Sequence, residues 1–384
     1  YSLSSLSHEV SVISSKFKAN YNQRNYGDVY RNFHSESDKN YDYKKVNGYH
    51  LYRLNSIKSP FGLFFFGLFP LLKKLKPEVI QIGEANSFLL FQVYIYSFFL
   101  DYIITVECHI HLSVYNAAKK FNKIYKNKNI KNRIKFFIRK LKQKLFYFYI
   151  SKIISTKVKR CYPISQDSEF IAINYLGYKS KQTKIMKLGT NVDLFNNNLK
   201  RNNDLKKKLG FKLHDIICIY TGRLDESKKP HLLSEAISKL NSDGFRNVRG
   251  LFIGDGAKKY KKKLENQYTK VIKFQEYKNL PKYYRISDIG IWPSQESTSQ
   301  LDALACGLPL ILNDEVGTPE RVMDCGFLFR KDSVDDLSEK ISILLNKDLR
   351  LKFSNNAAMK AKQNYSWKEI ACKYIKDYVN LLEK

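Results

Sequence analysis

Residues 293–309 read PSQESTSQLDALACGLP, and an apolar run follows at 310–312. The three hydroxyl residues at 297–299 predict the start of a helix, because short side-chain oxygens accept hydrogen bonds from free backbone N–H groups. A helix N-terminus attracts anionic or polyhydroxylated ligands. Asp302 falls in the first turns and can face the same side as Glu296. Two carboxylates beside such a helix end suit a ligand with hydroxyl groups at one end and phosphate at the other, as in a nucleotide sugar.

The length of the chain, 384 residues, indicates two domains that each bury a core of their own. The six cysteines are widely spread and form no C-x-x-C pair, which favours a reducing cytosol and gives no zinc signature. The chain begins with Tyr1 and has no signal-peptide pattern. We do not expect the apolar segments 61–72 and 87–106 to cross a membrane, because the first is too short and Gln92 and Asp101 interrupt the second.

Positive charge is concentrated in one part of the chain. The formal net charge is +31, no Asp or Glu occurs between residues 108 and 166, and sixteen Lys and Arg residues lie between Lys119 and Arg160. Apolar residues recur at three- and four-residue spacing from Ile130 to Phe148, which predicts a basic amphipathic helix. We expect segment 119–160 to contact an anionic membrane surface, and we do not expect nucleic acid as a partner. The alternatives are compositional drift and packing of the apolar stripe on the domain core.

Strand-like runs alternate with helical stretches in both halves, as in parallel α/β folds. We expect strands at 8–13, 77–83, 102–106, 161–165 and 183–189, and then at 216–220, 249–254, 271–274, 289–292 and 310–312. The polar stretch 190–213 is typical of a linker. The pattern predicts an N-terminal acceptor-binding domain at 1–192, a C-terminal domain at 193–364 and a final helix at 365–384 that packs back on the first domain. Two similar halves imply a ligand cleft between them.

An ordered set of motifs runs through the second half. It consists of Gly222-Arg223-Leu224 followed by Lys228, Gly254-Asp255-Gly256, the segments 288–294 and 303–309, Gly317-Thr318-Pro319-Glu320 and Tyr365-Ser366-Trp367. The glycines at 254 and 256 alone are a weak dinucleotide signal. In its order, however, the set resembles the nucleotide-sugar-binding domain of family-4 retaining glycosyltransferases of the GT-B fold. The resemblance implies an α/β chain with two Rossmann-like domains facing a central cleft.

The resemblance assigns two cations of the second half to the leaving group. Arg223 offers a planar fork and Lys228 a point charge, and both suit a diphosphate. In the family, the matching pair stabilises the diphosphate as its negative charge grows in the transition state. This implies catalysis without a metal, and the chain has no Asp-x-Asp motif. The alternative is a surface ion pair of either cation with Asp225 or Glu226.

The acidic motif is shorter than the family pattern. Asp302 matches the acid that binds the ribose hydroxyls, where Glu is usual; the alternative is an interaction with the helix dipole. The family's two acids are separated by seven residues, whereas Glu296 and Asp302 are separated by five. We interpret this as a shortened loop, in which Glu296 is a catalytic and donor-binding candidate. Ser297, Thr298 and Ser299 then replace the usual glycine-containing turn over the sugar.

Three more residues complete the expected donor site. Gly222 and Gly254 lie in the two glycine turns that the resemblance assigns to donor binding. Glu320 follows Pro319 and either contacts the nucleotide or caps a helix.

The first half matches the family more loosely. His109, after the strand-like run 102–106, is the first candidate for the histidine that commonly faces the transferred sugar. His111 is the second candidate, and an ordinary loop histidine is the alternative. Gly83-Glu84 and Ser165 are expected at strand ends facing the same cleft. Residues 6–10 resemble the family's second strand, so we expect the first strand and its glycine-rich loop to be missing from this sequence.

The residues and the resemblance together predict a retaining, metal-independent glycosyltransferase. It would move a sugar from a nucleotide diphosphate sugar to a glycan or lipid-linked acceptor in cell-surface polysaccharide synthesis. We expect no cofactor beyond the donor substrate, and a cytoplasmic protein peripheral on the inner membrane face. The alternatives are a sugar-nucleotide epimerase of similar fold and a non-catalytic nucleotide-sugar-binding protein. The sequence does not identify the donor base, the sugar or the acceptor.

Overall fold

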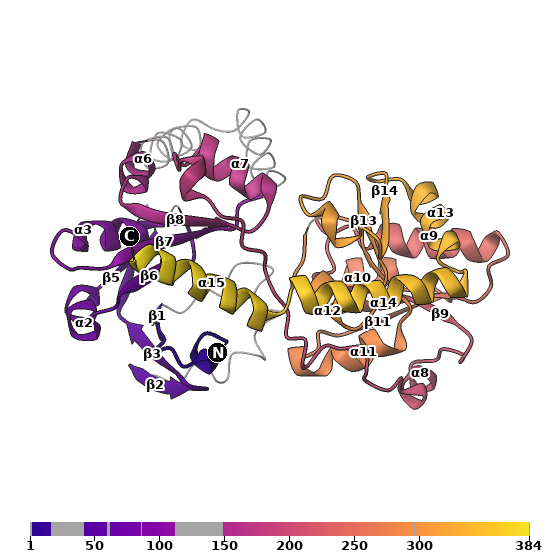
Figure 1. The fold of residues 1–384 in the computed structure, drawn as a ribbon. Helices are drawn as coiled ribbons and strands as arrows, with labels where there is room; N and C mark the ends of the chain where they lie inside the picture. The colour runs from indigo at the N-terminus through magenta and orange to yellow at the C-terminus, as the bar shows by residue number, and fades with distance from the viewer. Residues whose placement is uncertain are drawn as a thin grey trace. The chain divides into compact units, whose positions relative to one another are not determined.

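The computed structural model describes residues 2–16, 42–59, 62–85, 87–111, 149–294 and 296–383. The chain splits into two compact α/β units (Figure 1). Unit 1 contains the described parts of Tyr1–Ala19, Asp38–Lys187 and Ile370–Lys384. The described part of unit 2 is Leu188–Glu369. Most of the basic segment 119–160 lies outside the described residues, so its predicted amphipathic helix stays a prediction.

Unit 1 is built on a parallel three-stranded sheet with the order β6-β7-β8. These strands are β6 (Val79–Ile82), β7 (Ile103–Cys108) and β8 (Val158–Pro163). A second sheet contains β1 (Ser11–Ser15), β3 (Tyr49–Leu54) and β2 (Tyr43–Val46), and β4 (Ser56–Ser59) pairs with β5 (Gly62–Phe65). The helices are α2 (Leu68–Leu75), α3 (Phe88–Tyr96), α6 (Ser151–Ser155), α7 (Gln166–Asn174) and α15 (Trp367–Leu382), with short 3-10 turns at Ser4–Leu6 and Ser180–Gln182.

The expected strand at 183–189 is wrong. The segment makes only an isolated bridge, between Thr183 and Cys161. The N–H groups of Lys184 and Met186 do donate to the carbonyls of Cys161 and Pro163, so the chain runs beside β8. Pro163 has no N–H to return a bond, which prevents a regular ladder.

The C-terminal helix α15 contacts the main sheet of unit 1 through a buried carboxylate. Oδ2 of Asp377 accepts hydrogen bonds from Tyr162 Oη at 2.9 Å and from Arg160 Nε at 3.0 Å. Its Oδ1 accepts one from Lys184 Nζ at 2.7 Å. The ring of Tyr374 packs edge-on against Tyr162, with 4.7 Å between centroids. Residues from the far end of the sequence thus complete the core of unit 1.

Unit 2 contains a fully parallel six-stranded sheet with the order β11-β10-β9-β12-β13-β14. The strands are β9 (Ile216–Thr221), β10 (Val248–Ile253), β11 (Thr269–Ile272), β12 (Ile289–Trp292), β13 (Leu310–Asn313) and β14 (Gly326–Phe329). Counted along the unit, this is the 3-2-1-4-5-6 order of Rossmann folds, whose ligands bind at the carboxyl ends of the strands where the order reverses. That point lies between β9 and β12.

Helices cover both faces of this sheet (Figure 1). They are α8 (Asn203–Lys208), α9 (His231–Ser242), α10 (Lys258–Leu264), α11 (Pro281–Ile286), α12 (Ser299–Ala305), α13 (Val334–Ile343) and α14 (Lys347–Asn364), with 3-10 turns at Tyr277–Asn279 and Pro319–Arg321. The four central strands β10, β9, β12 and β13 are almost entirely buried and mostly apolar, as expected for a parallel sheet covered on both faces, whereas the edge strands β11 and β14 are only partly buried. The five strands expected in this half are present, within two residues of the expected bounds.

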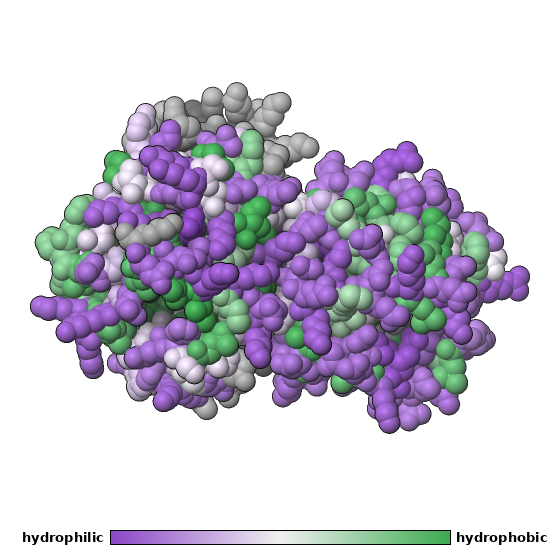
Figure 2. All heavy atoms as spheres, in the orientation of Figure 1, coloured by the Kyte–Doolittle hydropathy of each residue, from purple (hydrophilic) through white to green (hydrophobic). Residues whose placement is uncertain are grey.

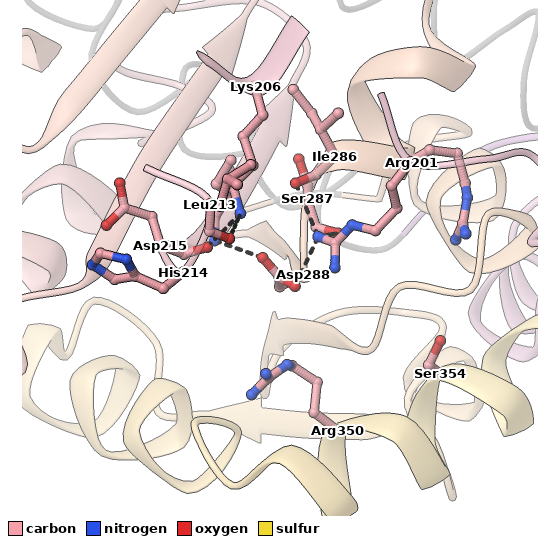
Figure 3. Close-up of polar contacts among 12 residues, drawn as sticks. Arg201, Lys206, Leu213, His214, Asp215, Ile286, Ser287, Asp288, Arg350 and Ser354 are labelled. Atoms are coloured by element: carbon pink, nitrogen blue, oxygen red, sulfur yellow. Dashed lines mark hydrogen bonds and ion pairs between the residues drawn. The ribbon is translucent and has the colours of Figure 1, made fainter. Parts of the chain in front are cut away.

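A charged cluster supports the amino ends of β9 and β12 (Figure 3). Lys206, only 4% exposed, donates from Nζ to the carbonyls of Leu213 at 3.0 Å and Asp215 at 2.7 Å. Asp288 accepts from the backbone N–H of Ile217 at 2.9 Å and pairs with Arg201 at 2.9 Å. The cluster fixes the two central strands at the edge opposite their carboxyl ends, where the candidate site lies.

Candidate functional site

A cavity of about 220 Å³ opens at the carboxyl ends of β9 and β12. Its walls come from the end of β9 and the loop after it, and from the end of β12 and the loop before α12. The lining residues are Tyr220, Thr221, Gly222, Arg223, Lys228, Trp292, Ser294 and Ser297. Because the strand order reverses between β9 and β12, this is the position at which a Rossmann fold binds its ligand.

One carboxylate organises the loop that carries the two cations. Oδ1 of Asp225 accepts from the backbone N–H groups of Ser227 at 3.0 Å and Lys228 at 3.1 Å. Its Oδ2 lies 3.1 Å from a terminal nitrogen of Arg223, whose side chain is about half exposed. The ion pair that we considered as an alternative is therefore present, but it lies on the cavity wall. Asp225 holds the loop and leaves much of the Arg223 guanidinium open to solvent.

The two cations of the cavity repel each other. Burial and the charge of Arg223 lower the pKa of Lys228, while Asp225 and Glu296 counteract part of that shift. A bound anion would offset both the burial cost and the repulsion. The cavity is therefore electrostatically suited to a multiply charged anion.

Two glycines allow the site turns to touch. A Cβ added to Gly254 would lie 1.8 Å from the carbonyl oxygen of Gly222, and one added to Gly256 would lie 2.0 Å from that of Leu224. Gly222 itself has φ 148°, a conformation that disfavours other residues. The turn 254–256 thus packs directly on the loop after β9. Gly254 therefore supports the cavity through its contact with Gly222, which lines it.

A hydrogen-bonded network joins the strand ends to the start of α12. The indole nitrogen of Trp292 donates to the carbonyl of Thr221 at 3.0 Å and lies 3.1 Å from the hydroxyl of Ser299. The hydroxyls of Ser297 and Ser299 are 2.7 Å apart. The helix begins at Ser299 as expected, but its N-cap Thr298 makes no side-chain cap bond. Ser297 Oγ instead accepts from the N–H of Ser299 at 3.3 Å.

Glu296 and Asp302 lie in different surroundings. Glu296 accepts a hydrogen bond from the backbone N–H of Gly317, and its charge acts on Lys228. Asp302 does not line the cavity and is 4% exposed. Its Oδ1 accepts from Thr190 Oγ1 at 2.6 Å and from Tyr277 Oη at 3.2 Å. Burial raises the pKa of Asp302 to about 6, although these two hydrogen bonds oppose the shift.

Arg321 supports the loop before α12, a role that no sequence pattern indicates. It is only 4% exposed, and one terminal nitrogen donates to the carbonyl of Ser297 at 3.0 Å and to the side chain of Gln300. The preceding residue, Glu320, is half-buried in the same 3-10 turn, and its role stays a prediction. A lone arginine after Thr-Pro-Glu carries no sequence pattern that indicates burial.

The histidine candidates lie in unit 1. His109 is paired through Nε2 with Glu107 at 2.7 Å and remains over a third exposed. His111 is buried, and its Nδ1 lies 3.1 Å from both carboxylate oxygens of Asp167. Ser165 also donates to Asp167 and caps helix α7. His111 and Ser165 therefore share Asp167 as a partner, whereas His109 pairs with Glu107. Which histidine acts on a sugar stays a prediction.

The fold and the site define a class of protein. The whole chain aligns with sucrose-phosphate synthase from Thermosynechococcus elongatus, covering 100% of this chain and 91% of that one, with a TM-score of 0.66 at 16% identity. The Anabaena protein HepE in complex with UDP-glucose aligns over 82% of both chains, with a TM-score of 0.58 at 17% identity. At such identities the likeness shows the fold alone. This chain has the two Rossmann-like α/β units of the GT-B fold.

The family match falls on unit 2. Residues 201–360 match the model described as glycosyl transferases group 1, so this part of the chain is a glycosyl transferases group 1 domain. An uncharacterized glycosyltransferase, MJ1069 from Methanocaldococcus jannaschii, is 27% identical over 259 residues, which cover 63% of this chain and 64% of that protein. The chain spans about half to two thirds of the length of the first curated relatives that it matches.

Proposed function

We propose that this chain is a glycosyltransferase that uses a nucleotide diphosphate sugar as its donor. The observation that carries the proposal is the cavity at the carboxyl ends of β9 and β12, with Arg223 and Lys228 on its wall. The glycosyl transferases group 1 match over unit 2 and the UDP-glucose named for a structural neighbour support the same donor class. A sugar-nucleotide epimerase and a non-catalytic binding protein are the alternatives that the experiment below tests.

In the proposed reaction, the bond between the sugar C1 and the diphosphate oxygen breaks. The electron pair leaves with the nucleoside diphosphate, so negative charge grows on its terminal phosphate. Arg223 supplies a planar pair of donors and Lys228 a point charge at that position. We propose that the acceptor hydroxyl attacks from the same face and gives its proton to the departing phosphate, so that the configuration at C1 is retained. The proposal includes metal-independent catalysis, since two cations already face the cavity.

We assign Asp302 to the ribose hydroxyls and Glu296 to the sugar, as the motif order implies. The neighbouring Tyr277, about half exposed, extends the Asp302 region toward the nucleoside.

We further propose a glycan or lipid-linked acceptor in cell-surface polysaccharide synthesis, and a cytoplasmic protein peripheral on the inner membrane face. The support for this location is the acid-free, lysine-rich stretch before Gln166. Among the described residues, no helix has the length and apolarity needed to cross a bilayer.

The test is hydrolysis and transfer with a panel of UDP-, GDP- and ADP-sugars. We expect one donor class to be consumed, with the α or β configuration of the donor preserved in the product by NMR. Arg223→Ala should lower kcat/KM by a factor of about 10²–10³, the effect of removing one charge-stabilising donor. Arg246→Ala is the matched control, because Arg246 is exposed on the same unit, and it should leave the rate unchanged.

Four outcomes would overturn parts of the proposal. If no donor binds and Arg223→Ala changes nothing, the enzyme assignment fails. If a donor binds without turnover in the presence of acceptor extracts, the chain is a binding protein. If the sugar is epimerised rather than transferred, the chain is an epimerase. Activity that disappears with EDTA and returns with a divalent cation would contradict metal independence.

A further inference from the structure

An exposed aromatic turn lies at one end of unit 1. Phe98 and Phe99 follow α3, and their side chains are 56% and 74% exposed. Ile95 on α3 and Ile153 on α6 are also exposed, at 38% and 55%. Figure 1 places α2, α3 and α6 along the same side of unit 1, and Figure 2 shows hydrophobic side chains over α3 there. Large apolar side chains gathered at a surface mark an interaction site more often than scattered ones do.

Ring and side-chain contacts connect these residues into one surface. The ring of Phe99 lies 6.3 Å from that of Phe69 on α2. The ring of Phe98 lies 5.3 Å from that of Tyr94 on α3, and Lys157, which follows α6, lies over it at 5.0 Å. Helix α6, which carries the exposed Ile153, also contacts α3. We call the exposed residues Ile95, Phe98, Phe99 and Ile153 the Phe98 surface.

Lysines occur on α2 and α6, the two helices that contact the aromatic turn or α3. Lys73 lies one helical turn after Phe69, and Lys157 stacks on Phe98. The exposed lysines of α2, α6 and their ends are Lys73, Lys74, Lys76, Lys152 and Lys157. Among the described residues of these segments, Asp101 and Glu78 are exposed acids. Apolar rings with a positive border match the boundary between acyl chains and anionic head groups, where aromatic rings insert and ammonium groups stay in the polar layer.

The positive charge of the lysines beside the Phe98 surface distinguishes two possible partners, a second copy of this chain and an anionic membrane. A second copy of this chain would meet the surface through the same patch, because isologous dimers are self-complementary. Lys157 on Phe98 and the neighbouring lysines of α2 and α6 would then approach their own copies, which is unfavourable. An anionic bilayer removes that repulsion and accepts the rings as well.

We propose that the Phe98 surface docks unit 1 onto an anionic membrane. This deepens the proposed function, since it gives the acceptor-binding unit a described contact with the layer that would hold a lipid-linked acceptor. The contact is distinct from the predicted helix within 119–160, and it uses two insertable rings on one turn. Surface attraction by the lysines and insertion of Phe98 and Phe99 act together, so both charge and apolar area contribute to binding.

The test is sedimentation of the full chain with vesicles of phosphatidylcholine alone or mixed equally with phosphatidylglycerol. We expect binding to the mixed vesicles that weakens as salt is raised, because screening reduces surface attraction. The variant F98S/F99S should bind at least tenfold more weakly. Every variant keeps residues 119–160, so this difference reports the Phe98 surface alone. Phe245→Ser, a 42% exposed phenylalanine on unit 2, is the matched control and should bind like the wild type.

Charge reversal and donor binding complete the experiment. K73E/K74E should lose the salt-dependent part of binding to mixed vesicles. All variants should keep their melting temperature and donor binding, because the altered side chains are exposed and are not cavity residues. Arg223→Ala should still bind vesicles. The two proposals therefore fail separately: absent donor turnover leaves vesicle binding intact, and absent vesicle binding leaves turnover intact.

Two results would overturn the inference. One is wild-type binding of F98S/F99S to mixed vesicles. The other is a dimer of the wild type, measured by light scattering without lipid, that F98S/F99S converts to a monomer. That result would assign the surface to a second copy of the chain.

Discussion

Thr190 Oγ1 donates a 2.6 Å hydrogen bond to Asp302 Oδ1, which lies 112 residues further along the chain. Tyr277 donates to the same oxygen at 3.2 Å. Both neutral donors therefore use one oxygen of a buried carboxylate. The charge itself has no cationic partner among these bonds, and burial raises the pKa of Asp302 to about 6. A carboxylate with these surroundings is costly to ionise until a ligand supplies more donors.

This cost predicts that Asp302→Asn is more stable than the wild type at neutral pH. The folded-state pKa of about 6 lies above the ordinary aspartate value of 3.8, so ionised Asp302 costs the folded state up to about 3 kcal/mol above pH 6. Below pH 3.8 both states are protonated and the cost disappears. Urea unfolding at pH 7.5 and pH 5 should show a gain for the variant that shrinks at the lower pH. Lower stability of Asp302→Asn at pH 7.5 would contradict this account.

The same pKa predicts how donor affinity depends on pH. Ionised Asp302 accepts hydrogen bonds from ribose hydroxyls, so affinity should fall as pH drops through about 6. Thr190→Val removes a bond that stabilises the charged form and should move the midpoint to higher pH. Thr190→Ser keeps the bond and is the control. Calorimetry with a nucleotide diphosphate sugar between pH 5 and 8 measures both midpoints; an unchanged midpoint in Thr190→Val would rule out Asp302 as the titrating group.

Gly254→Ala should disrupt the donor site without changing any polar group. The new Cβ would lie 1.8 Å from the carbonyl oxygen of Gly222, so one of the two turns must move. We expect a loss of about 1–3 kcal/mol in the free energy of unfolding, together with weaker donor binding. Gly83→Ala meets nothing within 4 Å and should change stability by less than about 0.5 kcal/mol. Equal effects of the two variants would show that the close approach is unimportant.

Arg321→Met should loosen the loop at 297–299. The substitution keeps much of the volume but removes the donors to the carbonyl of Ser297 and to Gln300. Leaving those buried acceptors unpaired should cost about 1–3 kcal/mol of stability and raise the donor KM. Thermal unfolding and steady-state kinetics measure the two effects. If Arg321→Lys has the wild-type KM while Arg321→Met has a raised KM, Arg321 is a positioning residue. If neither variant changes KM, the contacts of Arg321 with the loop at 297–299 do not shape the donor site.

Asp377→Asn should weaken the packing of helix α15 on strand β8 within unit 1. Burial opposes ionisation of Asp377, but the bonds from Lys184 and Tyr162 and the charge of Arg160 lower its pKa overall. A carboxylate whose pKa is lower in the folded state than in the unfolded state stabilises the fold at pH values above its unfolded-state pKa. This stabilisation is lost as the pH falls through the folded-state pKa. The variant should lose about 2–4 kcal/mol at pH 7, because breaking a buried pair leaves its partners unbalanced. Its deficit should narrow below pH 4. Asp101→Asn, an exposed acid of the same unit, serves as the control.

Much of unit 2 could be predicted because its central strands are buried on both faces. Continuous apolar runs such as Ile289–Trp292 have few other interpretations when turns and helices flank them. Arg223 and Lys228 could also be predicted as site residues, because they follow a strand and a glycine turn, and both line the cavity. The pattern of neighbouring residues along the chain was therefore sufficient to predict these strands and site residues.

Other features depend on distant contacts or on solvent exposure, which the sequence does not encode locally. Pro163 prevents a regular ladder with the segment at 183–189, although that segment has an ordinary strand composition. The partners of Asp302 and Arg321 come from remote loops. Phe98 and Phe99 sit within an apolar stretch whose composition is the same whether it is buried or exposed. Only the fold distinguishes those two cases.

The position of helix α15 has a consequence for synthesis. The described part of unit 2, Leu188–Glu369, is continuous in sequence, whereas unit 1 needs Ile370–Lys384 as well as the earlier residues. On the ribosome, the described part of unit 2 can therefore finish folding while unit 1 still lacks Tyr374 and Asp377. The unit that is translated first is completed last, and a chaperone or protease would meet its open core during that interval.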